Sequence, residues 1–364
     1  MKNIFQASLK WSSVVLAGAM FLASCNKDLE QAKPIVPPPP TATSTIAQLL
    51  DDPNFSTLKA AVTRANLMTA LADPTASFTV FAPDNAAFTA SGIPASAIPT
   101  FRPGFLDTLL RYHIIGGERL TASRISDRFP NMYLQSGFVL QAPSTAVPPG
   151  YRMPILPSRR SNIAWVNNIP IKAADIQAVN GVVHVPSFIV QPPSQVLAQI
   201  VAADTSLTFL LAAVQRADAG PPPGAPQLLP ILSNASANLT VFAPDNNAFR
   251  QTLAALGLPP EISSINLLPT TTVWGIVAYH VMTVRAFAAN LPSGVGNLPS
   301  LIGVPIQSRV TVTPPAPPTL IELRGNGNNL PTNPPTAFFA RVTTGDLNAI
   351  NGVVHKINAV LLPQ

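Results

Sequence analysis

Cysteine is almost absent from this chain. The 364 residues include a single one, Cys25, so a disulfide within the chain is impossible and stability must come from packing. Charged residues are also scarce, at 10%. The densest basic cluster is Arg152, Arg159 and Arg160, which is too small to resemble a nucleic-acid-binding patch. We therefore expect no nucleic-acid partner.

Motifs of hydrolases and metalloenzymes are missing as well. The sequence has no Gly-x-Ser-x-Gly, no His-Glu-x-x-His and no cysteine placed as a nucleophile. Its four histidines have no acidic or cysteine partners at metal-ligand spacing. A hydrolase is the least favoured interpretation, and we predict a protein that is not an enzyme, with no catalytic residues, metal or cofactor.

Apolar residues and proline are what the chain has in abundance. Apolar residues make up 47% of it and prolines number 41. This is not the composition of a disordered protein, and the prolines are expected to stiffen long loops rather than to interrupt a core. The length suits two domains and a leader.

The sequence contains an internal repeat. Three motifs occur twice in the same order: Thr-Val-Phe-Ala-Pro-Asp-Asn at 79–85 and 240–246, Tyr-His at 112–113 and 279–280, and Asn-Gly-Val-Val-His at 180–184 and 351–355. All four histidines belong to these motifs. The repeated unit has the size of a domain rather than of a solenoid repeat.

The first residues form a leader. Lys2 and Lys10 precede the apolar run 11–23, which is typical of a signal peptide. Leu-Ala-Ser-Cys at 22–25 resembles a bacterial lipobox, so we predict a signal peptide at 1–24 and lipid attachment at Cys25, with an ordinary secretory peptide as the alternative. Diacylation plus an N-acyl chain such as palmitate anchors a protein stably.

The residues that follow Cys25 indicate a location. Asp28 and Glu30 resemble the acidic tether of some Gram-negative surface lipoproteins. We expect attachment to the outer membrane with exposure at the cell surface, and the periplasmic face is the alternative. The proline-rich stretch within 25–42 favours polyproline II and predicts a semi-rigid spacer.

Local patterns predict the elements around the motifs. Residues 78–81 are expected to form a strand, Asp84 or Asn85 to cap a short helix, and 105–112 to form a helix. Residues 171–179 and 342–350 are expected to be matched strands, each closed by a two-residue Asn-Gly hairpin turn. The alternation after that turn places Val182, His184 and Phe188 on a core face. It places Val183 and Val185 on the other face, which their counterparts Val354 and Lys356 indicate to be an outer face at least in the second copy.

Long stretches at 116–168 and 283–339 differ between the two copies. We predict long loops there, because loops of this length usually carry function, and we regard them as candidate contact surfaces. Tyr151 and Arg152 in the first and Arg324 in the second are candidate partner-binding residues, the last beside a predicted hairpin tip.

Taken together, the three motifs resemble the fasciclin domain family. The resemblance covers 43–192 and 193–364, and it implies an α+β fold: two tandem domains, each a β-sandwich or wedge of about seven strands with packed helices. It also implies adhesion, and partner binding through Tyr112, His113, Tyr279 and His280. The flanking residues differ from those of animal members, so an animal ligand does not transfer, and a packed helix–strand junction is the alternative for each Tyr-His pair.

The leading functional hypothesis is a membrane-anchored, non-enzymatic adhesion or interaction lipoprotein that binds a surface protein or glycan. The alternative is a glycan-capture accessory component of a surface polysaccharide-uptake system. Aromatic platforms would be expected for that role, yet Trp165 and Trp274 are the only tryptophans after the leader.

Overall fold

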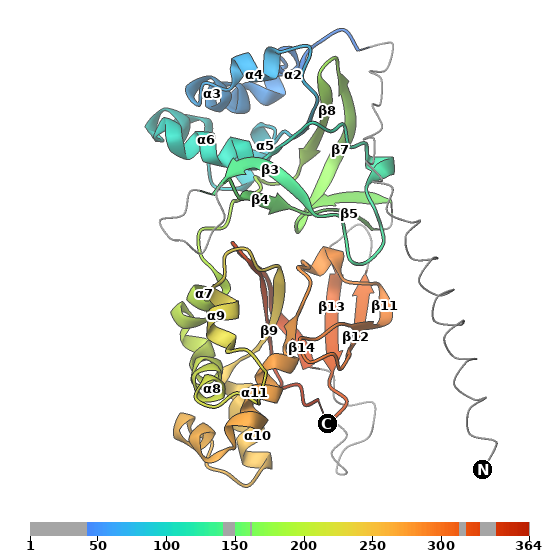
Figure 1. Ribbon diagram of the computed structural model, residues 1–364. Coiled ribbons are helices and arrows are strands. Elements are labelled where there is room, and N and C mark those ends of the chain that lie inside the picture. The colour runs from blue at the N-terminus through green and yellow to red at the C-terminus, as the bar shows by residue number, and fades with distance from the viewer. Residues whose placement is uncertain (1–41, 141–149, 161, 313–317, 328–339, 364) are drawn as a thin grey trace, which may run out of the picture. The chain divides into compact units, whose positions relative to one another are not determined.

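The structure is a computed structural model that describes residues 42–140, 150–160, 162–312, 318–327 and 340–363 (Figure 1). The predicted signal peptide, Cys25 and nearly all of the spacer lie outside the described residues. Two α+β domains follow each other along the chain. We call domain 1 the part from α2 to β8 and domain 2 the part from α7 to β15.

Domain 1 begins with helices, continues through a mixed region and ends with two long strands. Its helical elements are α2 (Ile46–Leu49), η1 (Pro53–Phe55), α3 (Ser56–Arg64), α4 (Met68–Ala72), α5 (Asn85–Ala90), η2 (Ala95–Thr100), α6 (Pro103–Tyr112) and η3 (Ala122–Arg124). Its strands are β1 (Phe78–Phe81), β2 (Ile114–Gly116), β3 (Leu134–Val139), β4 (Arg152–Ile155), β5 (Pro157–Arg160), β6 (Ile163–Val166), β7 (Ile169–Ala178) and β8 (Gly181–Pro186).

Domain 2 repeats this order. Its helical elements are α7 (Leu197–Ala203), η4 (Thr205–Leu207), α8 (Thr208–Asp218), α9 (Leu228–Ser233), α10 (Asn246–Ala255), η5 (Ile262–Leu267), α11 (Thr270–Tyr279) and η6 (Ala288–Asn290). Its strands are β9 (Leu239–Pro244), β10 (Val281–Met282), β11 (Gly294–Leu298), β12 (Ile306–Val312), β13 (Pro318–Arg324), β14 (Ala340–Ala349) and β15 (Gly352–Ile357).

The two sheets share one topology at their motif-bearing end. The sheet of domain 1 has the strand order β2-β1-β8-β7-β6-β5, and that of domain 2 has the order β10-β9-β15-β14-β13-β12-β11. In each, the strand from Thr-Val-Phe-Ala-Pro-Asp-Asn runs parallel to the strand from Asn-Gly-Val-Val-His, with Phe81 opposite His184 and Phe242 opposite His355. Motifs far apart in the sequence are therefore hydrogen-bonded neighbours. The helices and the mixed sheet of each domain confirm the predicted α+β class.

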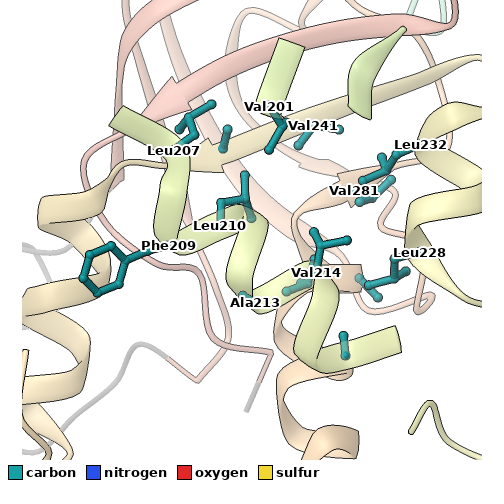
Figure 2. Packing of buried hydrophobic residues seen from close by; sticks show 14 of the residues in the cluster. Val201, Leu207, Phe209, Leu210, Ala213, Val214, Leu228, Leu232, Val241 and Val281 are labelled. Carbon is teal, nitrogen blue, oxygen red and sulfur yellow. The ribbon is translucent and has the colours of Figure 1, made fainter. Parts of the chain in front are cut away.

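The central motif-bearing strands of each sheet are buried on both faces. In domain 1 one face packs against the helices, through Val80, Val183 and Val185, and the opposite face carries a second apolar cluster that includes Phe81 and Met153. Domain 2 has the same two layers. The helical side of domain 2 is shown in Figure 2, where Leu210 and Val214 of α8 belong to the same buried cluster as Val241 of β9.

This double burial corrects the predicted faces of the last strand. Val183 and Val185 were expected to face outward, yet they are 2% and 4% exposed and contact the helices. Phe188 was expected in the core and is 45% exposed, because β8 ends at Pro186 and the alternation ends with it. Alternation identifies two faces, but it cannot tell that both are covered.

The Asn-Gly turn is also different from the prediction. Ala178 pairs with Gly181, so the two turn residues are Val179 and Asn180, and neither has a positive φ. Gly181 is required for another reason: a Cβ there would lie 2.4 Å from the carbonyl oxygen of Phe78. Gly352 of domain 2 approaches the carbonyl oxygen of Leu239 equally closely.

The stretches predicted as long loops contain much regular structure. Strands β3 to β6 form within 116–168, and β11 to β13 form within 283–339. Their apolar residues cover the face of the sheet opposite the helices, which gives these variable segments a place in the core. A turn is present at 326–327, where a hairpin tip was predicted, and the rest of that tip lies outside the described residues, as do residues 141–149.

In the part of the chain that the structure describes, no single helix has the length and apolar character needed to cross a membrane, and only the broken pair formed by 197–203 and 205–218, bent by 96°, meets both criteria together.

Candidate functional site

Each Tyr-His pair lies at a packed helix–strand junction. Helix α6 ends at Tyr112, His113 caps it, and β2 follows directly. The Tyr112 hydroxyl donates to the carbonyl oxygen of Pro154 at 3.0 Å and accepts from the amide of Asn167 at 3.1 Å. Burial raises the pKa of Tyr112. In domain 2 the Tyr279 hydroxyl donates to the carbonyl oxygen of Pro305 at 2.8 Å, and burial also raises its pKa.

The histidine of each pair is held by two backbone groups. His113 Nε2 accepts from the amide of Val190 at 3.0 Å, and its Nδ1 lies 2.8 Å from the carbonyl oxygen of Leu109. An amide N–H can only donate, so Nε2 is unprotonated and Nδ1 carries the proton. His280 makes the same two contacts, both at 2.8 Å. Burial lowers the pKa of His113 and of His280 to about 4, so both imidazoles are neutral.

The histidines of the closing motif are held in the opposite tautomer. His184 Nδ1 accepts from the amide of Asp175 at 3.3 Å, and Nε2 donates to the carbonyl oxygen of Leu120 at 2.7 Å. His184 also stacks on Phe81 with ring centroids 5.7 Å apart. Burial lowers the pKa of His184. His355 repeats this geometry with Asp346, Ala286 and Phe242.

The asparagine of the closing motif has a role that the sequence reasoning missed. Asn180 is fully buried; its side-chain oxygen accepts from the amide of Ile46 at 2.9 Å, and its side-chain nitrogen donates to the carbonyls of Leu71 and Asp73. It therefore attaches α2 and α4 to the end of β7. Asn351 makes the matching three bonds in domain 2. The recurrence of this asparagine at the same place in both copies was the signal available in the sequence.

The Asp-Asn pair after the first motif strand turns and ties the chain. Asp84 caps α5 by accepting from the amide of Ala87 at 2.8 Å, as predicted. Asn85 accepts from the amide of Thr57 and donates to the carbonyl of Pro53, which links α5 to the preceding helices. Asp245 and Asn246 do the same in domain 2.

These contacts decide between the two interpretations of Tyr-His. Tyr112, His113, Tyr279 and His280 are 0 to 2% exposed, and each polar tip is hydrogen-bonded inside its own domain. The packed-junction alternative is confirmed, and the four residues offer no surface to a partner. The helix end that carries them is covered by the strands of the variable segment.

The other candidate residues lie nearer to solvent. Arg152 begins β4 and is exposed, Tyr151 is half-buried beside it, and the Tyr151 hydroxyl lies 3.3 Å from that of Tyr133. Tyr133 is 40% exposed and was missed, because nothing in the sequence brings residues 133 and 151 together before the β3–β4 pairing is known. Arg324 is half-buried at the end of β13.

Trp165 is 1% exposed and Trp274 donates its indole N–H to the carbonyl of Pro226. Trp165 therefore forms no open aromatic platform, and Trp274 is half-buried. Among the described residues, no group of three or more His, Cys, Asp or Glu side chains is arranged to hold a metal ion.

The structure is thus a duplicated α+β domain whose four motif histidines are buried and hydrogen-bonded to backbone groups. The model of the fasciclin domain family matches residues 53–189 and 224–363. Protein sll1483 of Synechocystis sp. is 33% identical over 143 residues, which is 38% of this chain and 68% of that protein. A FAS1 domain pair from the insect cell adhesion molecule Fasciclin I aligns with a TM-score of 0.37 and 16% identity, over 87% of this chain and 95% of that one.

The chain belongs to the fasciclin domain family and carries two such domains in tandem. Fasciclin domains are associated with cell adhesion and interaction and are generally not enzymes.

Proposed function

We propose that this protein is a lipid-anchored adhesion lipoprotein of the outer membrane, attached through Cys25, that binds a protein or glycan partner at the cell surface without catalysis. One observation carries the proposal: each polar side chain of the shared motifs described above is hydrogen-bonded to at least one backbone group of the repeat copy that carries it. Recognition is thereby left to residues that differ between the domains.

The chemistry of the histidines supports a binding role. A general base needs a free lone pair within reach of a substrate proton. The lone pair of His113 is taken by the amide of Val190 and that of His184 by the amide of Asp175. A buried ring with both nitrogens bonded has no capacity for acid–base work, and the same holds in domain 2.

The β3–β4 hairpin of domain 1 is the contact surface that we propose. It forms a two-stranded sheet of its own, the hydroxyls of Tyr133 and Tyr151 lie 3.3 Å apart, and the exposed Arg152 follows Tyr151 at the start of β4. Tyrosine and arginine are enriched in interface hot spots, because they combine a large rigid area with hydrogen-bonding tips. Domain 2 contributes Arg324 as a separate candidate.

Anchoring and binding are tested separately. Cells that express the wild-type chain or Cys25→Ala are fed an alkyne fatty acid; we expect labelling of the wild-type protein only, and accessibility to external protease shows whether it faces outward. Equal labelling of both proteins contradicts the anchor.

For binding, the chain is screened against surface proteins and glycans, and we expect the double variant Tyr133→Ala with Arg152→Ala to weaken binding of the strongest hit by about 2 kcal/mol or more. The matched control is Leu256→Ala, an exposed residue of domain 2.

Glycan capture is the second candidate function, and the tyrosine pair favours it. The hydroxyl of Tyr133, which is 40% exposed, lies 3.3 Å from the hydroxyl of the half-buried Tyr151. Aromatic faces stack on sugar rings, and hydroxyls bond to their edges. Affinity electrophoresis in polysaccharide gels distinguishes the two functions: retardation that Tyr133→Ala abolishes supports glycan capture, and unchanged mobility in every gel excludes it for the polysaccharides used.

A further inference from the structure

The outer face of the domain 2 sheet carries a row of charged side chains. In β12 exposed and buried residues alternate, and the exposed Arg309 stands between the buried Ser308 and Val310. Arg309 lies opposite Glu322 of β13, and Glu322 lies opposite Arg341 of β14. Because side chains directly opposite each other on neighbouring strands share one face of a sheet, we call Arg309, Glu322 and Arg341 the charged row.

One carboxylate holds both guanidinium groups of the charged row. Arg309 Nε donates to Glu322 Oε2 at 2.6 Å, and Arg341 Nε lies 3.4 Å from Glu322 Oε1. The Glu322 side chain is 5% exposed, whereas those of Arg309 and Arg341 are 44% and 61% exposed. The two arginines therefore cover the carboxylate, and the row presents an excess of positive charge to solvent.

A third arginine lies on the same face. Arg324 follows Glu322 by two positions in β13, and alternate residues of a strand share a face. It lies opposite Gln307, which in turn lies opposite Asn297 of β11, and both of these amide side chains are exposed. In the sequence of β11, β12 and β13, Glu322 is the only acidic residue. The face thus combines positive charge with hydrogen-bonding amides.

Domain 1 builds the same row without charge. Pro170 and Arg341 each stand ten residues before the asparagine of the closing motif, so they are counterparts. Pro170 lies opposite Trp165, and Trp165 lies opposite Ser158, which completes the equivalent row. Trp165 and Ser158 are 1% and 0% exposed. The fold therefore does not require charge at this row, and because exposed ion pairs contribute little to stability, a partner of opposite charge explains the row better.

The chemistry of the face matches an acidic polysaccharide. A guanidinium pairs with an oxyanion through two parallel N–H bonds. Arg309 and Arg341 are two strands apart, about 10 Å, so a polymer with repeated acidic groups fits them better than one small anion does. Strands β11, β12, β13 and β14 contain no aromatic residue, so they offer no stacking platform to nucleic-acid bases or to neutral sugar rings. The amides of Gln307 and Asn297 can donate to and accept from sugar hydroxyls.

We propose that the outer face of β12, β13 and β14 in domain 2 binds an acidic polysaccharide, whose carboxylate or sulfate groups pair with Arg309, Arg324 and Arg341. The inference rests on the proposed function and deepens it, because it names the class of glycan that is bound at the cell surface. The face shares no residue with the β3–β4 hairpin, so the two surfaces are tested separately.

Binding of defined polymers to the full-length chain tests the proposal. Polygalacturonate and its methyl-esterified form share a backbone and differ in charge, as do dextran sulfate and dextran, and each is titrated by calorimetry. We expect saturable binding of an acidic polymer with a Kd on the order of 10 μM, and at least about tenfold weaker binding of its neutral form and of polyglutamate. Salt should weaken this binding, because it screens exposed charges. Comparison of the two acidic polymers distinguishes carboxylate from sulfate.

Variants of exposed arginines locate the site. Arg341→Gln removes one charge and leaves Glu322 paired with Arg309, and it should weaken binding at least about fivefold. Arg341→Gln combined with Arg324→Gln should weaken it at least about twentyfold. The matched control is Arg102→Gln, which removes an exposed arginine from domain 1 and should change binding by less than about twofold. Circular dichroism verifies that each variant is folded.

The proposal is overturned by any of three results: no saturable binding of an acidic polysaccharide, equal binding of the neutral form or of polyglutamate, or an effect of Arg341→Gln no larger than that of Arg102→Gln. Since Arg341→Gln leaves the pair of Glu322 with Arg309 in place, the last result is decisive even where the double variant fails to fold. A chain that binds the acidic polymer but does not attach to cells contradicts the proposed adhesion alone.

Discussion

Domain 1 and domain 2 agree in their buried polar contacts and differ in their ion pairs. Asn180 and Asn351 make the same three bonds, and the paired histidines adopt the same tautomers. The charged pairs are unrelated: Lys172 meets Asp84 in domain 1, and Lys356 meets Asp204 in domain 2. A buried donor or acceptor that loses its partner lowers the free energy of unfolding strongly, whereas a partly exposed ion pair contributes little to it. Substitution is therefore tolerated at the ion pairs and not at the buried polar contacts.

The largest effect is expected at the motif asparagines. Asn180→Ala leaves the amide of Ile46 and the carbonyls of Leu71 and Asp73 without partners, and we expect a loss of about 3–5 kcal/mol of unfolding free energy. Asn351→Ala should cost a similar amount in domain 2. Urea denaturation measures both, and Asn297→Ala, an exposed position on β11, should change stability by less than about 0.5 kcal/mol. A small effect at only one of the two asparagines breaks the equivalence of the domains.

The pH dependence of stability should come next. The pKa of His113 and of His280 falls from 6.5 to about 4 on folding, so each stabilises the fold only while neutral. That contribution is complete above pH 6.5 and is lost as the pH falls through about 4, because the unfolded chain binds the proton first. It amounts to about 3 kcal/mol for each histidine.

Urea midpoints measured between about pH 7 and about pH 4 test this prediction. His113→Gln should lower stability at neutral pH and flatten the curve by about half, and His280→Gln should do the same. An unchanged slope in both variants would show that carboxylates, not imidazoles, govern acid unfolding.

The motif glycines should show a somewhat smaller effect. Gly181→Ala places a methyl group 2.4 Å from the carbonyl oxygen of Phe78 and 2.8 Å from Ile46, which should cost about 1–3 kcal/mol. Gly352→Ala should match it. Gly104→Ala and Gly275→Ala are the controls: both lie in helices with open space around them, and should stabilise by about 0.5–1 kcal/mol. Thermal unfolding compares the four, and equal signs in all of them contradict the steric argument.

Removal of an ion pair should cause the smallest loss of unfolding free energy, and that loss should differ clearly between the two domains. The side chains of Lys356 and Asp204 are 20% and 24% exposed, against 36% and 22% for Lys172 and Asp84. We expect Lys356→Met to cost about 1 kcal/mol and Lys172→Met less than about 0.5 kcal/mol. High salt should shrink both values, because it screens exposed charges most. A larger loss at Lys172 would reverse the comparison.

Much of the local structure was predictable from the sequence. The strand at 78–81, the cap at Asp84 and the helix that ends at Tyr112 follow from β-branched runs, capping chemistry and helical spacing, which act over a few residues. Burial of the histidines was also predictable, from their shared face with valines. Their tautomers were not, since these depend on amides that lie far away in the sequence, such as Val190 for His113.

The candidate contact site was only partly predictable. Tyr151 and Arg152 stood out as aromatic and basic residues in a variable segment, and both lie near the surface. Tyr133 joined them only when β3 paired with β4, and the four Tyr-His residues became inaccessible only when strands covered the helix ends. The charged row of domain 2 likewise depends on the pairing of β12, β13 and β14, which brings Arg309, Glu322 and Arg341 onto one face.

By itself the sequence determined that one domain is used twice, that no disulfide supports it, and which positions must be small or polar, because identical residues recur at matched places. Only the tertiary structure decided which of those residues are accessible. It also decided that Gly181 must lack a side chain, because the parallel pairing of β1 with β8 brings Gly181 against the carbonyl oxygen of Phe78, and no local sequence pattern relates these two segments. Burial on both faces of a sheet is a property of the layers around it, and a single strand carries no record of what packs on either side.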